Sequence, residues 1–173
     1  MGKERQETVW IFGTDVQWFR IKHSGLYDMD KLLTAAKGYL SSKRYITVDA
    51  EHTEAVKGGG KEIRIEWKPF RNVNDYLKFN LNFEVTVWRE LDVLVDENGK
   101  KVKMQQGDLE VRFKASMAKN YRKTFRGPGK EFLRQTYEKY LIRRDLEQYE
   151  KVLQQEAEEF VDTIKMVLGS FRR

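Results

Sequence analysis

The most regular pattern of hydrophobic and polar positions lies in residues 76–88. Polar residues such as Lys78 and Asn80 alternate there with apolar ones. A period of two places the two kinds of side chain on opposite faces of an extended strand. We therefore predict a strand with one buried face, formed by Leu77, Phe79, Leu81, Phe83, Val85 and Val87.

Other segments are rich in β-branched and aromatic residues, which are typical of strands. They cover residues 9–23, 45–56, 62–68, 91–95 and 108–117. The first segment fits one long strand or two short ones, and Gly13 in its middle suggests a bulge or a bend. In the last segment, the alternation predicts that Leu109, Val111, Phe113, Ala115 and Met117 point inward.

Turns are predicted between these strands at residues 24–28, 57–61, 96–101 and 106–107. Residues 57–61 contain three consecutive glycines, which favour a flexible turn. Residues 96–101 contain the Asn-Gly pair that is typical of a tight hairpin. The order of strands and turns predicts an antiparallel meander.

Two segments predict helices. Residues 29–43 have apolar side chains at helical spacing, and Asp28 is a suitable N-cap. Residues 130–171 form a much longer segment, whose roughly 40 residues would span about 60 Å at 1.5 Å per residue. We expect this helix either to bend, near residues 143–145, or to project and contact a partner. Its contact stripe would consist of Leu146, Tyr149, Leu153, Phe160, Ile164 and Val167.

These elements predict a single α+β domain over residues 1–173, with a curved antiparallel sheet of about six or seven strands. A short helix and the long C-terminal helix would cover one face. This order resembles the helix-grip domains of the START and plant-allergen-like superfamily, which implies a small apolar ligand between sheet and helix. That superfamily usually has two helices after the first strand, where this chain has one. Residues 137–150, YEKYLIRRDLEQYE, are also similar to a segment of archaeal proteins, a resemblance that implies no activity.

The composition excludes several kinds of chemistry. The chain has no cysteine, which excludes disulfides, thiol nucleophiles and thiolate metal sites. Its two histidines are too few for a structural zinc site, which needs about four nitrogen or sulfur ligands. We assign no catalytic residue, no metal and no cofactor, and we expect a protein without enzymatic activity. Without a secretory signal or an apolar run of ~20 residues, it is expected to be soluble and cytoplasmic.

The positive charge is concentrated in one place. The net charge is +6, and residues 118–134 alone contain six basic residues and one acidic residue, a net charge of +5. Aromatic residues alternate with the basic ones, a composition that binds nucleobases and phosphates. The candidate contact residues are Lys119, Tyr121, Arg122, Lys123, Phe125, Arg126, Lys130 and Arg134. The alternative is a solvated connector whose aromatic side chains anchor it to the sheet.

Three functions follow from these features. The first is a non-enzymatic interaction or assembly module, in which the long helix contacts a protein partner or a second copy of the chain. The second is a nucleic-acid or ribosome-associated protein that uses residues 119–134. The third is binding of a small apolar molecule in a cavity of the helix-grip kind.

Overall fold

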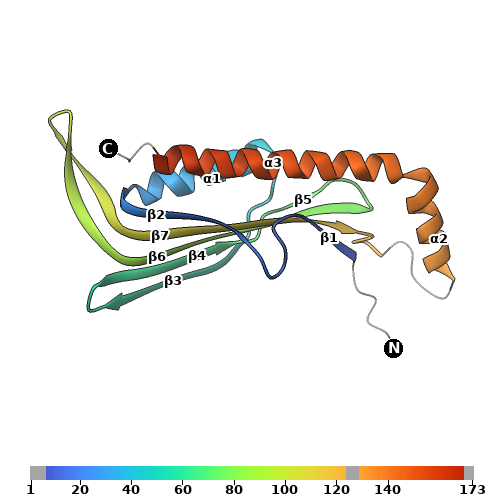
Figure 1. Ribbon diagram of the computed structural model, residues 1–173, viewed down its shortest axis with the longest axis horizontal. Helices are drawn as coiled ribbons and strands as arrows, with labels where there is room; N and C mark the ends of the chain where they lie inside the picture. Colours follow the sequence, from blue (N-terminus) through green and yellow to red (C-terminus); the bar gives the residue numbers. More distant parts are fainter. Residues whose placement is uncertain (1–6, 124–128, 170–173) are drawn as a thin grey trace.

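A computed structural model of the chain describes residues 7–123 and 129–169. One antiparallel sheet of seven strands runs through it, and the first helix and the long C-terminal helix lie on one face of this sheet (Figure 1). This is the α+β fold that the sequence predicts. The elements are β1 (Glu7–Phe12), β2 (Phe19–Tyr27), α1 (Met29–Ser42), β3 (Asp49–Lys57), β4 (Gly60–Trp67), β5 (Phe70–Asn72), β6 (Leu77–Glu97), β7 (Lys100–Lys119), α2 (Lys130–Thr136), the π-helix η1 (Tyr137–Leu141) and α3 (Arg143–Gly169).

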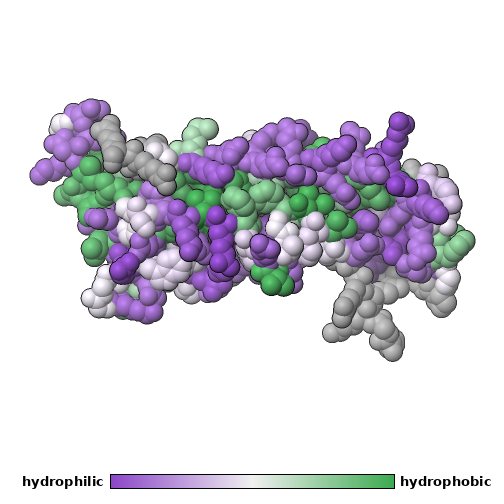
Figure 2. Space-filling view, viewed as in Figure 1, coloured by the Kyte–Doolittle hydropathy of each residue, from purple (hydrophilic) through white to green (hydrophobic). Residues whose placement is uncertain are grey.

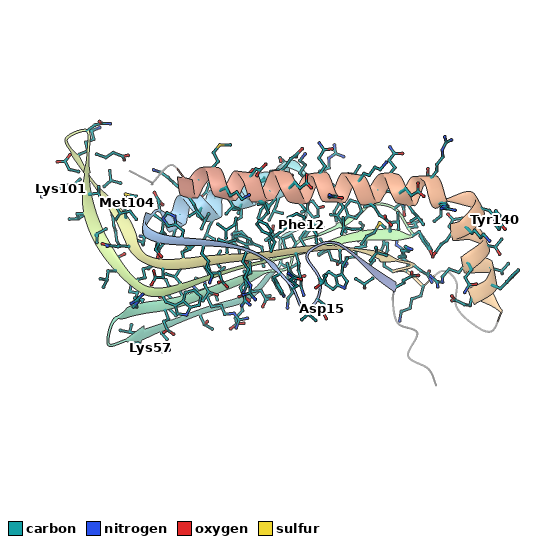
Figure 3. The ribbon with its side chains drawn as sticks, viewed as in Figure 1. Phe12, Asp15, Lys57, Lys101, Met104 and Tyr140 are labelled. Atoms are coloured by element: carbon teal, nitrogen blue, oxygen red, sulfur yellow. The ribbon has the colours of Figure 1, made fainter. Side chains whose placement is uncertain are left out.

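The long strands β6 and β7 form the centre of the sheet. The strand order is β1-β7-β6-β4-β3, while β2 also pairs with β7 and β5 with β6. Asn98 and Gly99 join β6 to β7 with φ angles of 55° and 79°. Two positive φ angles are the mark of the type I′ hairpin that Asn-Gly favours. Beyond the other strands this hairpin continues as a curled arm, with Lys101 near its tip (Figures 1 and 3).

The predicted apolar face of the sheet is buried. All six apolar residues predicted for β6 belong to the core, as do the inward residues of β7. Burying a side chain of this size contributes roughly 1.5–3 kcal/mol. The neighbouring strand β4 adds Ile63, Ile65 and Trp67 to the same core. The hydrophobic pattern therefore determines which face of the sheet the helices cover.

Two predicted turns are wrong, and a bulge in a neighbouring strand explains the one at residues 106–107. Residues 24–27 continue β2, and residues 106–107 lie within β7, where Gly25 pairs with Gly107. The neighbouring strand β6 has a bulge between Trp88 and Leu91. A Cβ atom on Gly107 would lie 3.0 Å from the carbonyl oxygen of Trp88. Gly107 has no Cβ atom and therefore lets the bulged strand β6 approach closely. In the sequence, a glycine with this role cannot be told apart from a glycine in a turn.

The first helix begins as predicted. The side chain of Asp28 accepts a hydrogen bond of 2.9 Å from the backbone N–H of Lys31. This cap satisfies one of the free N–H groups at the start of α1. Leu32, Ala36 and Leu40 are buried along one side of the helix. Because α1 packs beside α3 on the sheet, both helices contribute to one core.

The C-terminal helical region bends once, at Ile142. The helix begins at Lys130, passes through the π-helix η1 and bends before α3 starts at Arg143. The φ and ψ angles of Ile142 are −122° and 5°, outside the helical region. The bend therefore falls immediately before residues 143–145, where the length of the segment suggests one. We call residues 130–142 the elbow; Figure 1 shows α2 turning away from the axis of α3.

Candidate functional site

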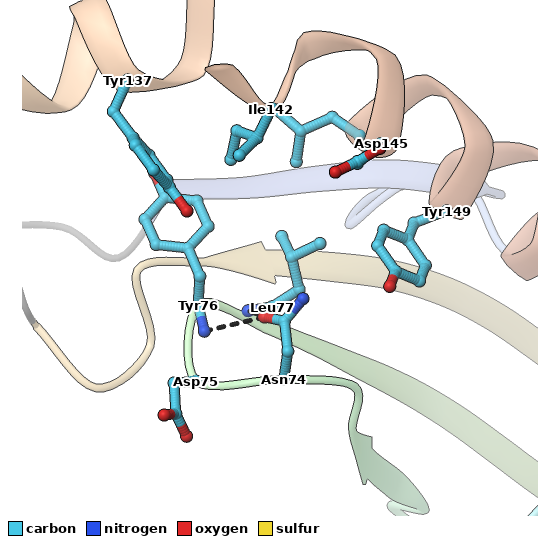
Figure 4. Close-up of a pocket in the computed structure, with 9 residues that line it drawn as sticks. Asn74, Asp75, Tyr76, Leu77, Tyr137, Ile142, Asp145 and Tyr149 are labelled. Carbon is cyan, nitrogen blue, oxygen red and sulfur yellow. Dashed lines mark hydrogen bonds between the residues drawn. The ribbon is translucent and has the colours of Figure 1, made fainter.

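A pocket lies beneath the elbow, at the end of the sheet where β6 begins. Its volume is about 360 Å³. We call it the elbow pocket; it is lined by Asn74, Asp75, Tyr76, Leu77, Tyr137, Ile142, Asp145, Leu146 and Tyr149. Figure 4 shows that the helical residues face the residues of the turn before β6 across this space. Two segments at least 60 positions apart in sequence thus form one site.

The floor of the pocket is a rigid turn. The side-chain oxygen of Asn74 accepts hydrogen bonds of 2.8 Å from the backbone N–H groups of both Tyr76 and Leu77 (Figure 4). The N–H of Val73 donates to the carbonyl of Leu77 at 3.0 Å. Asparagine often closes turns in this way, because its short side chain replaces a backbone acceptor. The floor therefore has a defined shape before any ligand binds.

The roof depends on the π-helix. The N–H of Ile142 donates to the carbonyl of Tyr137 at 3.2 Å, which is the five-residue spacing of a π-helix. The extra residue in this turn precedes the bend, so the next helix leaves in a new direction. Single π turns inside helices occur frequently at functional sites. Here the bend lies directly over the pocket, and both Tyr137 and Ile142 line it.

Aromatic contacts hold the two sides of the pocket in place. The rings of Tyr76 and Tyr137 pack edge to face with centroids 5.6 Å apart. On the other side, Tyr149 of α3 packs against Phe79 of β6 at 6.4 Å. Edge-to-face pairs at these distances contribute about 0.5–1.5 kcal/mol beyond their burial. Each wall of the pocket thus connects the helical region to the sheet.

A network of charges anchors the elbow to the sheet. Glu138 accepts hydrogen bonds from the hydroxyl of Tyr76 and, at 3.0 Å, from Arg134, and it lies 3.7 Å from Lys119. Arg134 also contacts Glu7 of β1 at 2.5 Å. Burial raises the pKa of the Tyr76 phenol, and the hydrogen bond to Glu138 raises it further. The phenol therefore stays protonated and acts as the donor.

Two carboxylates line the pocket, and they differ in whether a described residue forms an ion pair with them. Asp75 lies 2.7 Å from the guanidinium of Arg122, and both side chains are largely exposed. Asp145 lies in the first turn of α3, where the helix dipole favours a negative charge. Within residues 7–123 and 129–169, no ion pair involves Asp145. Its carboxylate lies between Ile142 and Tyr149 at the roof of the pocket (Figure 4).

The structure divides the predicted basic residues into three groups. Lys119 and Arg134 are mostly buried in ion pairs with Glu7 and Glu138. Arg122 pairs with Asp75 at the rim of the pocket and lies against the ring of Tyr121. Lys123 and Lys130 are exposed, as Arg122 is, and no ion pair with a described residue involves either lysine, while Phe125 and Arg126 lie outside the described residues.

The predicted contact stripe of the long helix packs against the chain's own sheet. Leu153, Phe160 and Ile164 are fully buried in the core, Leu146 is buried, and the other two residues are partly buried. Leu146 and Tyr149 also line the elbow pocket. The stripe is therefore accessible to a partner only if α3 leaves the sheet. Figure 2 shows mostly hydrophilic side chains on the opposite, solvent side of α3.

The polar face of the sheet is neutralised by its own ion pairs. Glu84 is buried between Arg64 at 2.8 Å and Arg112. Lys114 is also buried, 2.9 Å from Asp15 in the loop that Figure 3 shows on the side away from the helices. Its ammonium group lies 4.8 Å and 4.3 Å from the ring centroids of Trp10 and Trp18, respectively. These contacts fit a stable polar surface. The basic side chains in them are already paired within the chain and do not form a binding track for a phosphate backbone.

Most of the pocket carries no signal in the sequence. The sequence marks no residue of β6 or its preceding turn as a candidate contact residue, and it marks Asp145 only as a point where the helix bends. Asn74 and Asp75 are the usual residues of a turn, so their presence before a strand carries no functional signal. Arg122, Leu146 and Tyr149 were predicted as contact residues, and the fold brings all three to one site.

No protein-family model and no curated protein sequence matches the chain. Among the described residues, no helix has the length and apolar character required to cross a membrane. The same residues contain no group of three or more histidine, aspartate or glutamate side chains placed to hold a metal ion. The geometry of the elbow pocket is thus the main guide to function.

Proposed function

We propose that the chain is a non-enzymatic binding module that holds a small, partly apolar ligand in the elbow pocket. The observation that carries this proposal is the pocket itself, about 360 Å³ in volume and formed between a rigid turn and a bent helix. Ligand sites usually combine apolar walls with a few polar groups that orient the ligand. Leu77, Ile142 and Leu146 provide the walls here, while two carboxylates and three phenols provide the polar groups.

The position of the pocket favours ligand binding over the alternative in which the apolar stripe of α3 contacts a protein partner. The stripe is already packed against the sheet, whereas the elbow pocket is open to solvent. The helix-grip resemblance implies a ligand between sheet and C-terminal helix, and the elbow pocket has that position. The nine lining residues include no histidine, lysine, serine or threonine. They therefore offer none of the serine, threonine or lysine nucleophiles that a neighbouring base activates, which fits binding without catalysis.

A ligand screen by nuclear magnetic resonance tests the proposal. With ¹⁵N-labelled protein and a library of small amphipathic molecules, we expect the amide signals of Asn74, Leu77 and Tyr149 to shift together. Ile142→Trp would fill the pocket and abolish these shifts. Val152→Trp, on the exposed side of α3, is the matched control and would leave them unchanged. If the whole library leaves these amides unchanged, or if Ile142→Trp binds normally, the proposal is wrong.

A second candidate function is contact with a protein partner, favoured by one observation on the outer side of the elbow. Phe132, Leu133 and Tyr140 are 71%, 55% and 71% exposed. Figure 3 shows Tyr140 at this end of the molecule. Grouped apolar side chains on a surface often mark a protein contact. Self-association at this patch predicts a dimer, measured by light scattering, that persists in high salt and is lost in the double variant Phe132→Ser, Leu133→Ser.

Nucleic-acid binding by residues 119–134 stays a prediction. Three of the basic residues already have carboxylate partners within the chain, which reduces the charge available to phosphates. Binding of mixed RNA that weakens steeply with salt would support it. The variant Lys123→Ala, Lys130→Ala, which leaves the internal ion pairs intact, would then bind less RNA.

A further inference from the structure

We infer that the elbow pocket selects a cationic ligand: an organic ammonium or guanidinium group attached to a small apolar body. The inference rests on the proposed function and adds the chemical class of the ligand. Three features of the pocket carry it, namely its aromatic rings, its carboxylates and its apolar floor and roof.

The aromatic rings favour a positive charge. Tyr76, Tyr137 and Tyr149 all line the pocket, and they come from both sides of it. The face of an aromatic ring carries partial negative charge, so a cation within about 6 Å of its centre is attracted. Aromatic pockets use this attraction to bind ammonium groups that have lost part of their hydration shell. Three tyrosines in one small pocket provide such surfaces around a single site.

The carboxylates add a negative charge that the fold leaves open. Asp145 lies at the roof, and no ion pair with a described residue occupies it. Asp75, at the rim, is largely exposed, holds the guanidinium of Arg122 at 2.7 Å, and directs its carboxylate away from the cavity (Figure 4). One carboxylate thus binds a cation of the chain itself outside the cavity, and Asp145 is the carboxylate that lies at the roof of the cavity. The cationic group of a ligand would form an ion pair with Asp145, as Arg122 does with Asp75.

The start of α3 is the main feature that would favour an anion instead. A helix N-terminus carries about half a positive charge. Asp145 lies in the first turn of α3 and places a full negative charge at that point. With Asp75 the pocket has two carboxylates, and Arg122 neutralises one of them. The balance within the pocket is therefore negative, which disfavours an anionic ligand.

The size and walls of the pocket define the rest of the ligand. Leu77, Ile142 and Leu146 form an apolar surface opposite the charged and phenolic groups. A volume of about 360 Å³ is at the lower end for pockets that hold small molecules. A single ring or a short alkyl chain beside the cationic group fits these limits. Phenethylammonium has both parts and serves as the probe.

Three probes with the same phenyl ring test the inference. Phenethylammonium is the cation, 2-phenylethanol the neutral analogue and 3-phenylpropanoate the anion. Titrations at pH 7, followed by the amide signals of Leu77 and Tyr149, should give a dissociation constant for the cation about tenfold lower than for the alcohol. The anion should bind more weakly than both.

Variants test whether the carboxylate of Asp145 is the group that selects a cationic ligand. Asp145→Asn should weaken phenethylammonium binding about fivefold to tenfold and leave 2-phenylethanol binding unchanged. Asp162→Asn, on an exposed position of the same helix, is the matched control and should change neither. Equal affinity of the three probes at the pocket amides would overturn the cation preference while leaving the proposed function intact. Preference for the anion would overturn the inference as well, and absence of all three probes from the pocket would count against both proposals.

Discussion

The centre of α3 and its elbow differ sharply in how completely they fill the space above the sheet. At the centre, the ring of Phe160 lies 5.3 Å from Phe83, 4.7 Å from Phe113 and 5.6 Å from Tyr39. All the side chains of this cluster except Tyr39 are fully buried. At the elbow, the aromatic pairs Tyr76–Tyr137 and Phe79–Tyr149 lie on either side of an open pocket.

The difference arises from the path of the helix. A regular helix places residues three and four positions apart on one side, so α3 directs an unbroken series of side chains onto the sheet. The π-helix and Ile142 interrupt this periodicity at the elbow. Side chains before and after the bend then point to the sheet from different directions, and the space between them stays open. The packing thus indicates that the centre provides stability, and the elbow leaves the open space in which we propose that a ligand binds.

The largest expected effect comes from the centre. Phe160→Ala removes a ring that contacts three others and leaves a cavity, which typically costs about 3–5 kcal/mol of unfolding free energy. Urea denaturation followed by circular dichroism measures this loss. Met166→Ala, at a position that is 75% exposed on the same helix, is the control and should change stability little. A small loss for Phe160→Ala would mean that the centre is not the stable region that its packing indicates.

A smaller effect is expected from the charge network of the elbow. Glu138→Gln removes the negative charge that accepts hydrogen bonds from Tyr76 and Arg134 and replaces one carboxylate oxygen with a donor, which should cost about 1–3 kcal/mol. The control is Glu147→Gln, whose ion pair with Arg143 is exposed and contributes between about 0 and 1 kcal/mol. Similar losses in both variants would show that the network does not hold the elbow on the sheet.

Acid should weaken the attachment of the elbow to β1. The hydrogen bond from Arg134 is the main cause that lowers the pKa of Glu7 below its ordinary value of 4.5. A lowered folded-state pKa contributes stability that is present above pH 4.5 and is lost as the pH falls through the folded value. Glu7→Gln should therefore be less stable than the natural chain at pH 7, and the two midpoints in urea should converge towards pH 3. A difference that stays constant with pH would contradict this assignment.

The smallest effect on stability is expected at the rim of the pocket. The Arg122–Asp75 pair is exposed, so Arg122→Ala should change the unfolding free energy by less than about 1 kcal/mol. The same change releases Asp75, and phenethylammonium should then bind severalfold more tightly. Lys123→Ala removes a neighbouring exposed charge without freeing a carboxylate and is the control. Weaker binding in Arg122→Ala would show that the guanidinium supports the ligand instead of competing with it.

Local patterns predicted the elements well where a local cause decides them. The alternation in β6, the N-cap Asp28 and the hairpin at Asn98-Gly99 each depend on residues within a few positions of one another. They were confirmed because a side-chain period, a cap or a turn conformation acts over that distance. The length of the C-terminal segment also indicated that the helix would either bend or project, since a straight helix would exceed the sheet, and the structure has a bend at Ile142.

The sequence by itself thus determined the α+β fold, the buried face of the sheet and the region of the bend. The tertiary structure alone decided which distant residues meet. Gly25 pairs with Gly107 across two strands, and Asp75 comes to lie beneath a helix that starts at Arg143. No local pattern encodes such contacts, because they depend on how twisted strands and a bent helix pack in three dimensions. The elbow pocket therefore became visible only in the folded chain.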